Sequence, residues 1–356
     1  MREERWDEAD TLIRRKFGAV PWGDQVLFAV MRRDTASERE LRARAPEMAG
    51  EKGRRTNGLA LETGGLLATY AEDLERAEEF TRLGTAASLT PGLQASAHQQ
   101  LANLAVAGGR WSVAKTEFAA GGAHPDSALV GRALAATLPF LAVPKPDLKA
   151  VQAEVERWEP GSDVSTPLPE SVRPLTGHLR LYLLGLLSVR QGDGASALRY
   201  AGELERLAAP ADSRALVRDL GRTIRADVAA GAGRNGEALS QLEGVKGEVP
   251  FELIRLPYFS GEHARYLRGL LLHQVGRDEE SLHLLEVAFT GTPNELHYRA
   301  PMHLLRAEIL QRLNKRAAAT EQYSRLVNLW GSCDPALRPV VEGAKVELAG
   351  LTAEPR

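Results

Sequence analysis

The sequence is poor in the residues on which several classes of protein depend. It has one cysteine, Cys333, so no disulfide can form within the chain and a cysteine-rich zinc site is excluded. Aromatic residues make up 6% of the chain, and Ala, Leu, Arg, Glu and Gly dominate, a composition that favours helices over sheets. The formal net charge is −2 at pH 7, which leaves no global positive field to hold nucleic acid or an acidic membrane.

Long apolar runs are also missing. No stretch approaches the ~18 apolar residues that a membrane helix needs. The charged opening, MREERWDEAD, is not followed by the apolar segment of a signal peptide. The low cysteine content fits a reducing compartment. We therefore expect a cytoplasmic protein without a membrane span.

The chain does contain a repeated pair of helical patterns. Five stretches show apolar residues at a 3.6-residue period, a short break with Gly or Asn, and a second helical pattern. In each, one small residue precedes another by twelve positions, which predicts two antiparallel helices that approach closely there. The pairs are Ala102 and Ala114, Gly185 and Ala197, Ala226 and Ala238, Gly269 and Ser281, and Ala307 and Ala319. Four positions after each pair, on the same helix face, stand Phe118, Ala201, Leu242, Leu285 and Tyr323.

This pattern resembles the tetratricopeptide repeat, which has small residues at its eighth and twentieth positions and a large or aromatic residue at its twenty-fourth. The resemblance covers roughly residues 59–331 and is clearest from residue 178 onward. It implies an all-α fold, a right-handed α-solenoid of helix hairpins with a C-terminal capping helix. Successive second small residues from Ala197 onward lie 41, 43 and 38 positions apart, more than the ~34 of the family. Ala77 marks an earlier, degenerate unit.

The positions of the prolines, and how closely each stretch follows the repeat pattern, indicate four segments in the chain. We predict degenerate repeats over 1–135, a proline-rich connection with one helix over 136–177, the best-formed repeats over 178–331, and a capping helix with a tail over 332–356.

Two aspartates stand where helices are expected to begin. Asp147 is predicted to cap the helix of the proline-rich connection, which Pro160 would end. Asp334 is predicted to cap the closing helix, with Pro335 in its first turn.

Three glycines, Gly231, Gly233 and Gly236, have the G-x-G-x-x-G spacing of a dinucleotide-binding loop. That loop must follow a strand and open a βαβ unit. Here the preceding segment is helical by period, and the glycines fall on the break between two helices, where the other repeats also carry Gly or Asn. We interpret them as a hairpin turn with a left-handed residue that ends the first helix, and we expect no cofactor.

A C-terminal stretch of about 60 residues, from Thr292 to Leu351, resembles more narrowly the end of the repeat tail in bacterial regulators that carry a eukaryotic-type Ser/Thr kinase or a winged-helix domain at the N-terminus. No H-R-D, D-F-G or glycine-rich kinase loop is present, so the chain resembles such a tail without its effector domain. Whether it stands alone or is a shortened reading frame stays open. The matching residues are Ala300, Pro301, Arg306, Ala307, Glu308, Tyr323, Leu329, Trp330, Asp334, Pro335 and Pro339.

Candidate catalytic and metal-binding residues are few. His263, His273 and His283 are ten positions apart, so neighbours on one helix would lie about 80° apart and make no metal face. No motif gives Cys333 a base or a lowered pKa. We expect no metal site and no enzymatic activity, with an unrecognised helical active site as the remote alternative.

The resemblance implies a concave surface lined by the first helix of each hairpin. This surface is interpreted as binding a protein or peptide, as a scaffold or adaptor. A sensory tail that acts in signalling with a separately encoded kinase or DNA-binding regulator is the alternative. The repeated Lys and Asn with which some relatives hold a peptide carboxylate are missing, so that ligand is not expected. The implied lining is Gln99, Asn103, Tyr182, Thr223, Asp227, Tyr266, His273, Glu308 and Gln311.

Overall fold

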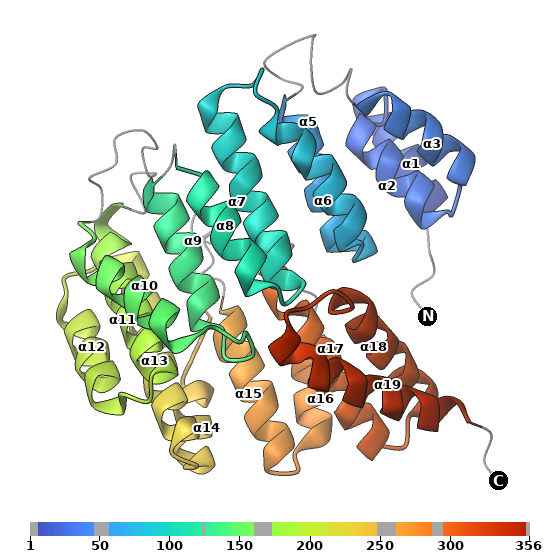
Figure 1. The fold of residues 1–356 in the computed structure, drawn as a ribbon. Coiled ribbons are helices and arrows are strands. Elements are labelled where there is room, and N and C mark those ends of the chain that lie inside the picture. Colours follow the sequence, from blue (N-terminus) through green and yellow to red (C-terminus); the bar gives the residue numbers. More distant parts are fainter. Residues whose placement is uncertain are drawn as a thin grey trace. The chain divides into compact units, whose positions relative to one another are not determined.

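The computed structural model describes residues 6–45, 57–122, 125–159, 173–247, 261–286 and 295–353. Every regular element in these ranges is helical, which confirms the all-α expectation (Figure 1). The helices in these ranges are too short or too polar to cross a lipid bilayer.

The chain forms two compact units, which we describe separately. Unit 1 comprises residues 1–104 and 116–123, and unit 2 comprises residues 105–115 and 124–356. The expected boundary at 135/136 therefore falls inside unit 2, within α9. Unit 1 holds α1 (Trp6–Phe17), α2 (Trp22–Met31), α3 (Thr35–Ala43), α5 (Asn57–Leu66), the π-helical turn η1 (Leu67–Ala71), α6 (Leu74–Arg82), η2 (Leu83–Thr85) and most of α7 (Pro91–Ala107).

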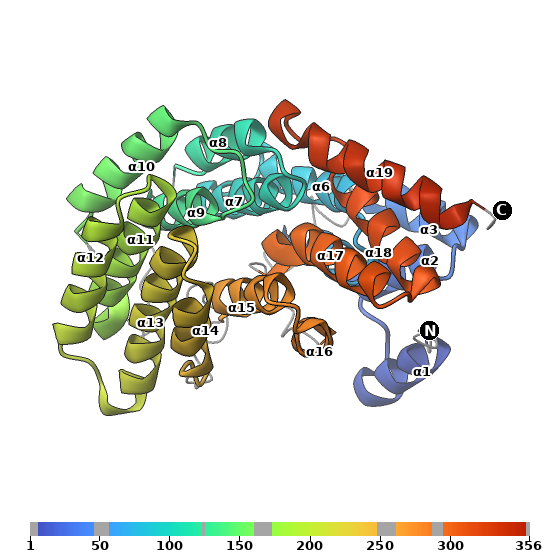
Figure 2. The same ribbon diagram turned by 90° about the horizontal axis from the view of Figure 1, so that it is seen from below.

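Unit 2 is built mainly from helix hairpins. Its first helices α11, α13, α15 and α17 contact one another in chain order (Figure 2). The helix α8 (Trp111–Ala120) is shared between the units. The remaining helices are α9 (Pro125–Thr137), α10 (Lys145–Arg157), α11 (Thr176–Arg190), α12 (Gly194–Arg206), α13 (Arg214–Gly231), α14 (Asn235–Glu243), α15 (Glu262–Gln274), α16 (Asp278–Glu286), α17 (Glu295–Arg312), α18 (Arg316–Leu329) and α19 (Arg338–Thr352).

The same type of turn joins the two helices at each of the five predicted hairpin breaks. Two positions after the first helix ends, a residue takes a left-handed φ, and two positions later the second helix begins. The next N–H bonds back to a carbonyl five residues earlier, as from Arg234 to Ala229 at 2.9 Å, which is the Schellman arrangement. The interpretation of the glycine motif as a turn is confirmed. The left-handed residues are Gly109, Gly192, Gly233, Gly276 and Asn314.

A sixth turn of this kind joins α2 to α3 and was missed because it carries neither Gly nor Asn. Arg33 has a φ of 57°, and the N–H of Asp34 bonds to the carbonyl of Ala29 at 2.9 Å. The Asp34 carboxylate accepts from the N–H of Ser37 at 3.1 Å and so caps α3. This cap helps to offset the cost of a left-handed arginine, about 1 kcal/mol.

The small residues allow helices to approach closely, as predicted. In the α15–α16 hairpin, Ser281 Oγ donates to the carbonyl of Gly269 at 2.7 Å. A methyl group added to Gly269 would lie 2.9 Å from Leu285 Cδ2. At Gly185 the close neighbour is different, because an added methyl would meet Ile224 Cδ1 at 2.6 Å. There the small residue admits α13 of the next hairpin.

Both predicted aspartate caps are wrong, and the first is Asp147. The helix α10 begins at Lys145, so Asp147 already lies in its first turn. Its carboxylate accepts from Trp111 Nε1 at 2.8 Å and from Lys115 Nζ at 2.7 Å, both on α8. Burial by itself would raise the pKa of Asp147, but the hydrogen bonds from Lys115 and Trp111 and the charge of Lys115 together lower it. Pro160, the expected end of this helix, lies outside the described residues.

Asp334 caps α8 rather than the closing helix. It precedes the short 3₁₀ turn η7 (Pro335–Leu337), and its side chain makes no bond to that turn or to α19. Instead its carboxylate accepts from the N–H of Ser112 at 3.1 Å and from the Ser112 hydroxyl at 2.7 Å. Trp330 Nε1 also donates to the carbonyl of Ala107 at 3.0 Å. These bonds join the first and last segments of unit 2.

The turn geometry makes opposite predictions for two glycines of one motif. Gly233 has a φ of +72°, whereas Gly236 lies inside α14, and an added methyl would meet no atom within 4 Å at either site. Gly233→Ala should lower the free energy of unfolding by about 1 kcal/mol because it forces a left-handed alanine. Gly236→Ala should raise it by roughly 0.5 kcal/mol. Urea denaturation checks both, and equal effects would contradict the turn assignment.

Candidate functional site

The nine sequence-predicted site residues fall into three places. Gln99 and Asn103 lie half-buried on α7 in unit 1. The other seven lie in unit 2 and divide into a buried group and a solvent-facing group. We call Tyr182, Thr223, Tyr266 and the half-buried Asp227 the buried group, and the exposed Glu308 with the half-buried His273 and Gln311 the solvent-facing group.

Within the buried group, Tyr266 lies against another aromatic side chain of the chain itself. Phe140, from the α9–α10 connection, packs edge-on against Tyr266 and Tyr298 with ring centroids 5.7 and 5.3 Å away. Trp330 closes the cluster at 6.3 Å from Phe140. Tyr182 and Tyr266 are only 4% and 9% exposed. The sequence patterns gave no sign of this, because Phe140 belongs to no hairpin.

Two of the predicted lining residues, Tyr182 and Tyr266, therefore pack in the interior of unit 2, and Thr223 is buried there as well. Its side chain is buried, and its hydroxyl donates to the carbonyl of Asp219 in the same helix at 2.8 Å. This burial corrects the expectation that Tyr182, Thr223 and Tyr266 present an open surface to a partner. Family positions place first-helix residues on one face, and at Tyr266 the inserted connection covers that face.

Arginine holds the covering connection in place. Arg190, the last residue of α11, donates to the carbonyls of Pro139 and Leu141 at 2.9 and 2.7 Å, one on each side of Phe140. Burial lowers the pKa of the Arg190 guanidinium, and the nearby Asp227 carboxylate opposes that effect. The two bonds fix the backbone on both sides of the phenylalanine ring.

Asp227, the fourth member of the buried group, belongs to a polar chain across three first helices. Its carboxylate lies 2.8 Å from His263 Nε2, and His263 Nδ1 lies 3.0 Å from the Tyr298 hydroxyl. Burial raises the pKa of Tyr298 well above its ordinary value, so the phenol stays protonated. A protonated phenol is a poor nucleophile. The chain Asp227–His263–Tyr298 thus supplies hydrogen bonds that bind α13, α15 and α17 together.

The solvent-facing group is organised by an ion pair. Asp278, at the start of α16, lies 2.6 Å from His273 Nδ1 on α15 and 2.7 Å from Arg312 Nε on α17. The Asp278 side chain is only 10% exposed, whereas that of Arg312 is 49% exposed. One carboxylate therefore neutralises Arg312 and fixes the orientation of the imidazole.

Next to this ion pair, α17 presents two further polar side chains. Gln311 Nε2 donates to Glu347 of α19 at 2.7 Å, and the Tyr323 hydroxyl donates to Gln311 Oε1 at 2.8 Å. Glu308 is exposed and makes no hydrogen bond within the described residues. Loss of hydration beside the protein raises the pKa of Glu308, the neighbouring His273 and Arg312 oppose that rise, and Glu347 adds the smallest contribution.

Two further expectations concern metal binding and the reactivity of the cysteine thiol. Within the described ranges, no group of three or more His, Cys, Asp and Glu side chains is placed to hold a metal ion. Cys333 is buried, and burial raises the pKa of its thiol, the opposite of what a reactive thiolate needs.

Comparison with models of known protein families and with curated proteins finds no match to this chain. The resemblance to tetratricopeptide repeats therefore rests on the hairpin pattern: the twelve-residue spacing of the small residues, the following buried residue and the turn.

Burial of Tyr266 predicts a stability effect. Tyr266→Ala removes a ring that contacts Phe140 and Tyr298 and should lower the free energy of unfolding by roughly 3 kcal/mol. Tyr266→Phe keeps the ring and should change it by less than about 1 kcal/mol. Thermal and urea denaturation of the two variants check this. An unchanged melting temperature for Tyr266→Ala would show that the ring is not packed.

A buried histidine predicts acid sensitivity. His297 is 1% exposed, neither ring nitrogen has a hydrogen-bond partner among the described residues, and burial lowers its pKa from 6.5 to about 4. Between these values the unfolded chain binds a proton that the folded chain refuses, so stability is lost as the pH falls below about 6.5.

The size of this effect is accessible by comparison with a variant. Between about pH 7.5 and pH 5, the wild type should lose about 2 kcal/mol more stability than His297→Leu. Urea denaturation at the two pH values measures the difference. Equal losses of stability in the two proteins would show that folding does not lower the pKa of His297.

Proposed function

We propose that this protein is a non-catalytic cytoplasmic scaffold, a right-handed solenoid of tetratricopeptide-like hairpins that binds another protein. In this proposal the partner docks on polar side chains of α15 and α17, the first helices of the last two hairpins, and of α19. We call them the C-terminal polar surface: His273, Glu308, Gln311, Arg312 and Glu347. Stacked hairpins in general present such surfaces on a preformed backbone, so binding costs little reorganisation.

One observation carries the proposal, the exposed Glu308 carboxylate, which has no hydrogen-bond partner among the residues that the structure describes. Arg312 is already neutralised by Asp278. The pKa of Glu308 is raised chiefly because the carboxylate has lost hydration, and the nearby Glu347 adds the smallest contribution. A cationic side chain of the partner placed against Glu308 would compensate for the lost hydration. We therefore infer that the partner contributes a lysine or arginine to this surface.

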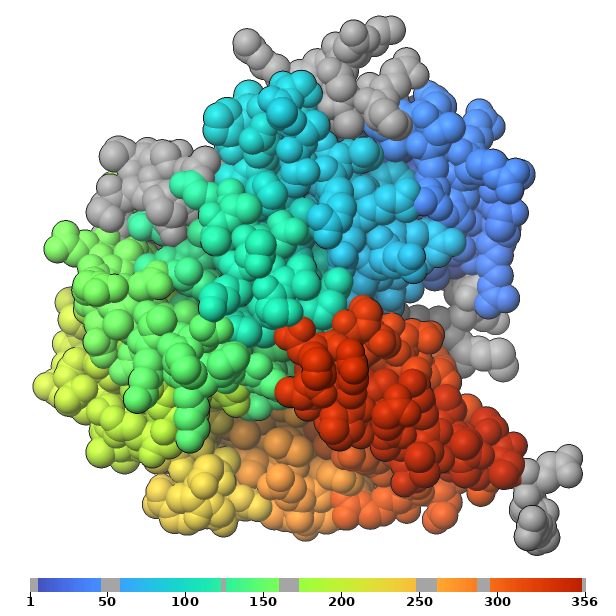
Figure 3. All heavy atoms as spheres, viewed as in Figure 1, coloured from blue at the N-terminus to red at the C-terminus, as the bar shows by residue number. Residues whose placement is uncertain are grey.

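The end of the repeat pattern supports an open surface at this place. In each of the five predicted hairpins, the small residue of the first helix stands five positions before the helix ends. The corresponding residue of α19 is Glu347, a long charged side chain. Because Glu347 is not small, the pattern predicts no second helix packed against this side of α19. The helix α19 lies on the surface of unit 2 (Figure 3).

The first test maps the partner. A photo-crosslinking amino acid at position 311 should capture a specific protein from cells, and the same group at position 321, on the exposed side of α18, should not. The captured protein is then purified and its binding is measured with the isolated chain. Crosslinks of equal yield at both positions would contradict a defined surface.

The second test measures the free energy of partner binding with a matched pair of variants. Glu308→Gln should weaken binding of the purified partner by about 1–3 kcal/mol, because it removes the carboxylate that faces the partner's cation. Glu321→Gln removes an exposed carboxylate of α18, whose ion pair within the described residues is with Arg325 four residues on, and should leave affinity unchanged. Melting temperatures should match the wild type in both. Unchanged affinity in Glu308→Gln would remove this surface as the site.

A further inference from the structure

The first helix of unit 1, α1, lies at the edge of the unit and is only partly covered. The Trp6 ring lies 6.0 Å from the ring of Phe28 on α2. Arg32 of α2 bonds to the Trp6 carbonyl at 3.3 Å and to the Asp7 carboxylate at 2.8 Å. Figure 2 shows α1 set apart from α3. Among the described helices of unit 1, α1 is the one without a buried residue.

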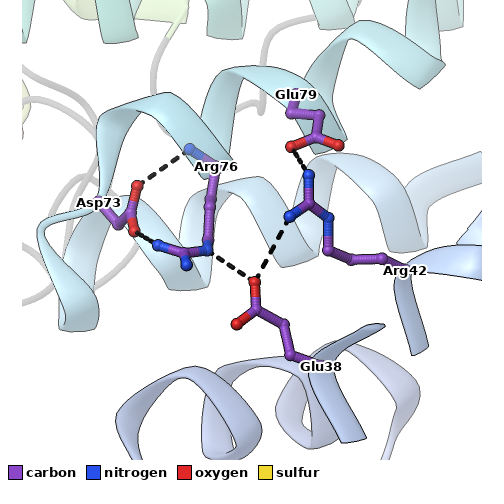
Figure 4. Close-up of polar contacts among 5 residues, drawn as sticks. All are labelled: Glu38, Arg42, Asp73, Arg76 and Glu79. Carbon is purple, nitrogen blue, oxygen red and sulfur yellow. Dashed lines mark hydrogen bonds and ion pairs between the residues drawn. The ribbon is translucent and has the colours of Figure 1, made fainter. Parts of the chain in front are cut away.

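The α2–α3 hairpin, by contrast, is bonded to the hairpin that follows it. Glu38 of α3 is buried, and its Oε1 accepts from Arg76 Nε of α6 at 2.7 Å (Figure 4). Arg42 of α3 bonds to Glu79 of α6, and Arg76 also bonds to Asp73. These charged groups satisfy one another and fix α3 against α6. The partly covered helix α1 is therefore attached to a hairpin that is itself held in place.

The apolar residues of α1 form a stripe that α2 covers only in part. They are spaced by three or four residues, so they share one side of the helix. The stripe consists of Trp6, Ala9, Ile13 and Phe17, with Leu12 at its edge. The first three are half-buried, whereas Leu12 is 62% and Phe17 is 66% exposed. A second apolar surface laid against this side of α1 would remove both from water.

The charges of α1 are divided by sign along its length. The first turn carries the acidic Asp7 and Glu8, and the last turn carries the basic Arg14, Arg15 and Lys16. An antiparallel copy of the same helix would place the acidic end of each beside the basic end of the other. The two helix macrodipoles would also run in opposite directions, which is favourable. The helix is therefore complementary in charge to a second copy of itself.

The register of such a pair follows from three exposed residues. Glu8, Leu12 and Arg15 stand at steps of four and three positions and lie along one face of α1. When two antiparallel helices meet with Leu12 against Leu12 of the second copy, Glu8 of each helix lies beside Arg15 of the other. Both ion pairs form together, because a two-fold axis relates the two copies.

We propose that α1 pairs antiparallel with α1 of a second copy of this chain, so that the protein forms a weak dimer. A helix of twelve residues buries a small area, which places the interface in the weak class. A membrane surface fits less well, because interfacial helices carry mainly Lys and Arg on the polar face, whereas α1 has as many acidic as basic residues. The dimer contact is independent of the C-terminal polar surface, which belongs to unit 2.

Charge reversal in the full chain tests the pairing. Sedimentation equilibrium of the wild type over about 1 µM to 1 mM should show a monomer–dimer equilibrium. Glu8→Lys and Arg15→Glu should each raise the dimer Kd at least about tenfold, because each change turns two attractions into two repulsions. In an equimolar mixture of the two variants the reversed charges face each other. The mixture should therefore recover the wild-type Kd within about threefold, which a merely damaged helix would not do.

The apolar contact is tested by Leu12→Ser, which should raise the dimer Kd at least about tenfold and leave the melting temperature of the monomer unchanged. The matched control is Val346→Ser on α19, which removes another exposed apolar side chain and should leave the Kd unchanged. A wild type that stays monomeric throughout, including one whose α1 binds lipid vesicles or another protein, would overturn the proposal. So would a dimer that the charge variants leave intact or that Val346→Ser dissociates.

Discussion

The architecture depends on one backbone constraint, a left-handed residue two positions after the first helix of each hairpin ends. The residue reverses the chain and satisfies the last carbonyls of the helix, so the second helix begins at a fixed distance. Small residues then let the two helices meet, as at Gly269 and Ser281, where a hydroxyl bonds directly to the neighbouring backbone. With the hairpins fixed, the first helices of unit 2 lie in contact, and their side chains decide what is buried and what is left for a partner.

The face formed by these first helices is largely part of the core. Phe140 covers Tyr266 and Tyr298, and the polar chain from Asp227 to His263 and Tyr298 satisfies groups that burial would otherwise penalise. A buried polar network that is fully bonded favours one arrangement of the helices over others. Solvent-facing polar side chains remain toward the end of the array, and for that reason the binding proposal concerns α15, α17 and α19 rather than the aromatic interior.

Features encoded locally could be predicted from the sequence. The turns at Gly233 and Asn314, and the close contact at Gly269, each depend on residues within one hairpin. Features that join distant segments could not. Asp334 looked like the cap of its own helix, yet its carboxylate bonds to Ser112, 222 positions earlier.

The candidate sites show the same division. Glu308 was named from helical position and is exposed, and His273 and Gln311 are half-buried near it, although the carboxylate that organises this surface, Asp278, was not named. Tyr266 was placed on an open face because the repeat pattern contains no information about the inserted connection.

Hydroxyl-radical footprinting with mass spectrometry tests most directly whether the aromatic face is closed and the C-terminal polar surface is the place for a partner. In the free chain, Tyr182 and Tyr266 should be oxidised far more slowly than Tyr70, which is 57% exposed. Binding of the partner should protect His273 and leave the slow rates of Tyr182 and Tyr266 as they are. Oxidation of these two tyrosines at the rate of Tyr70, with protection on binding, would instead show an open aromatic groove and contradict the account.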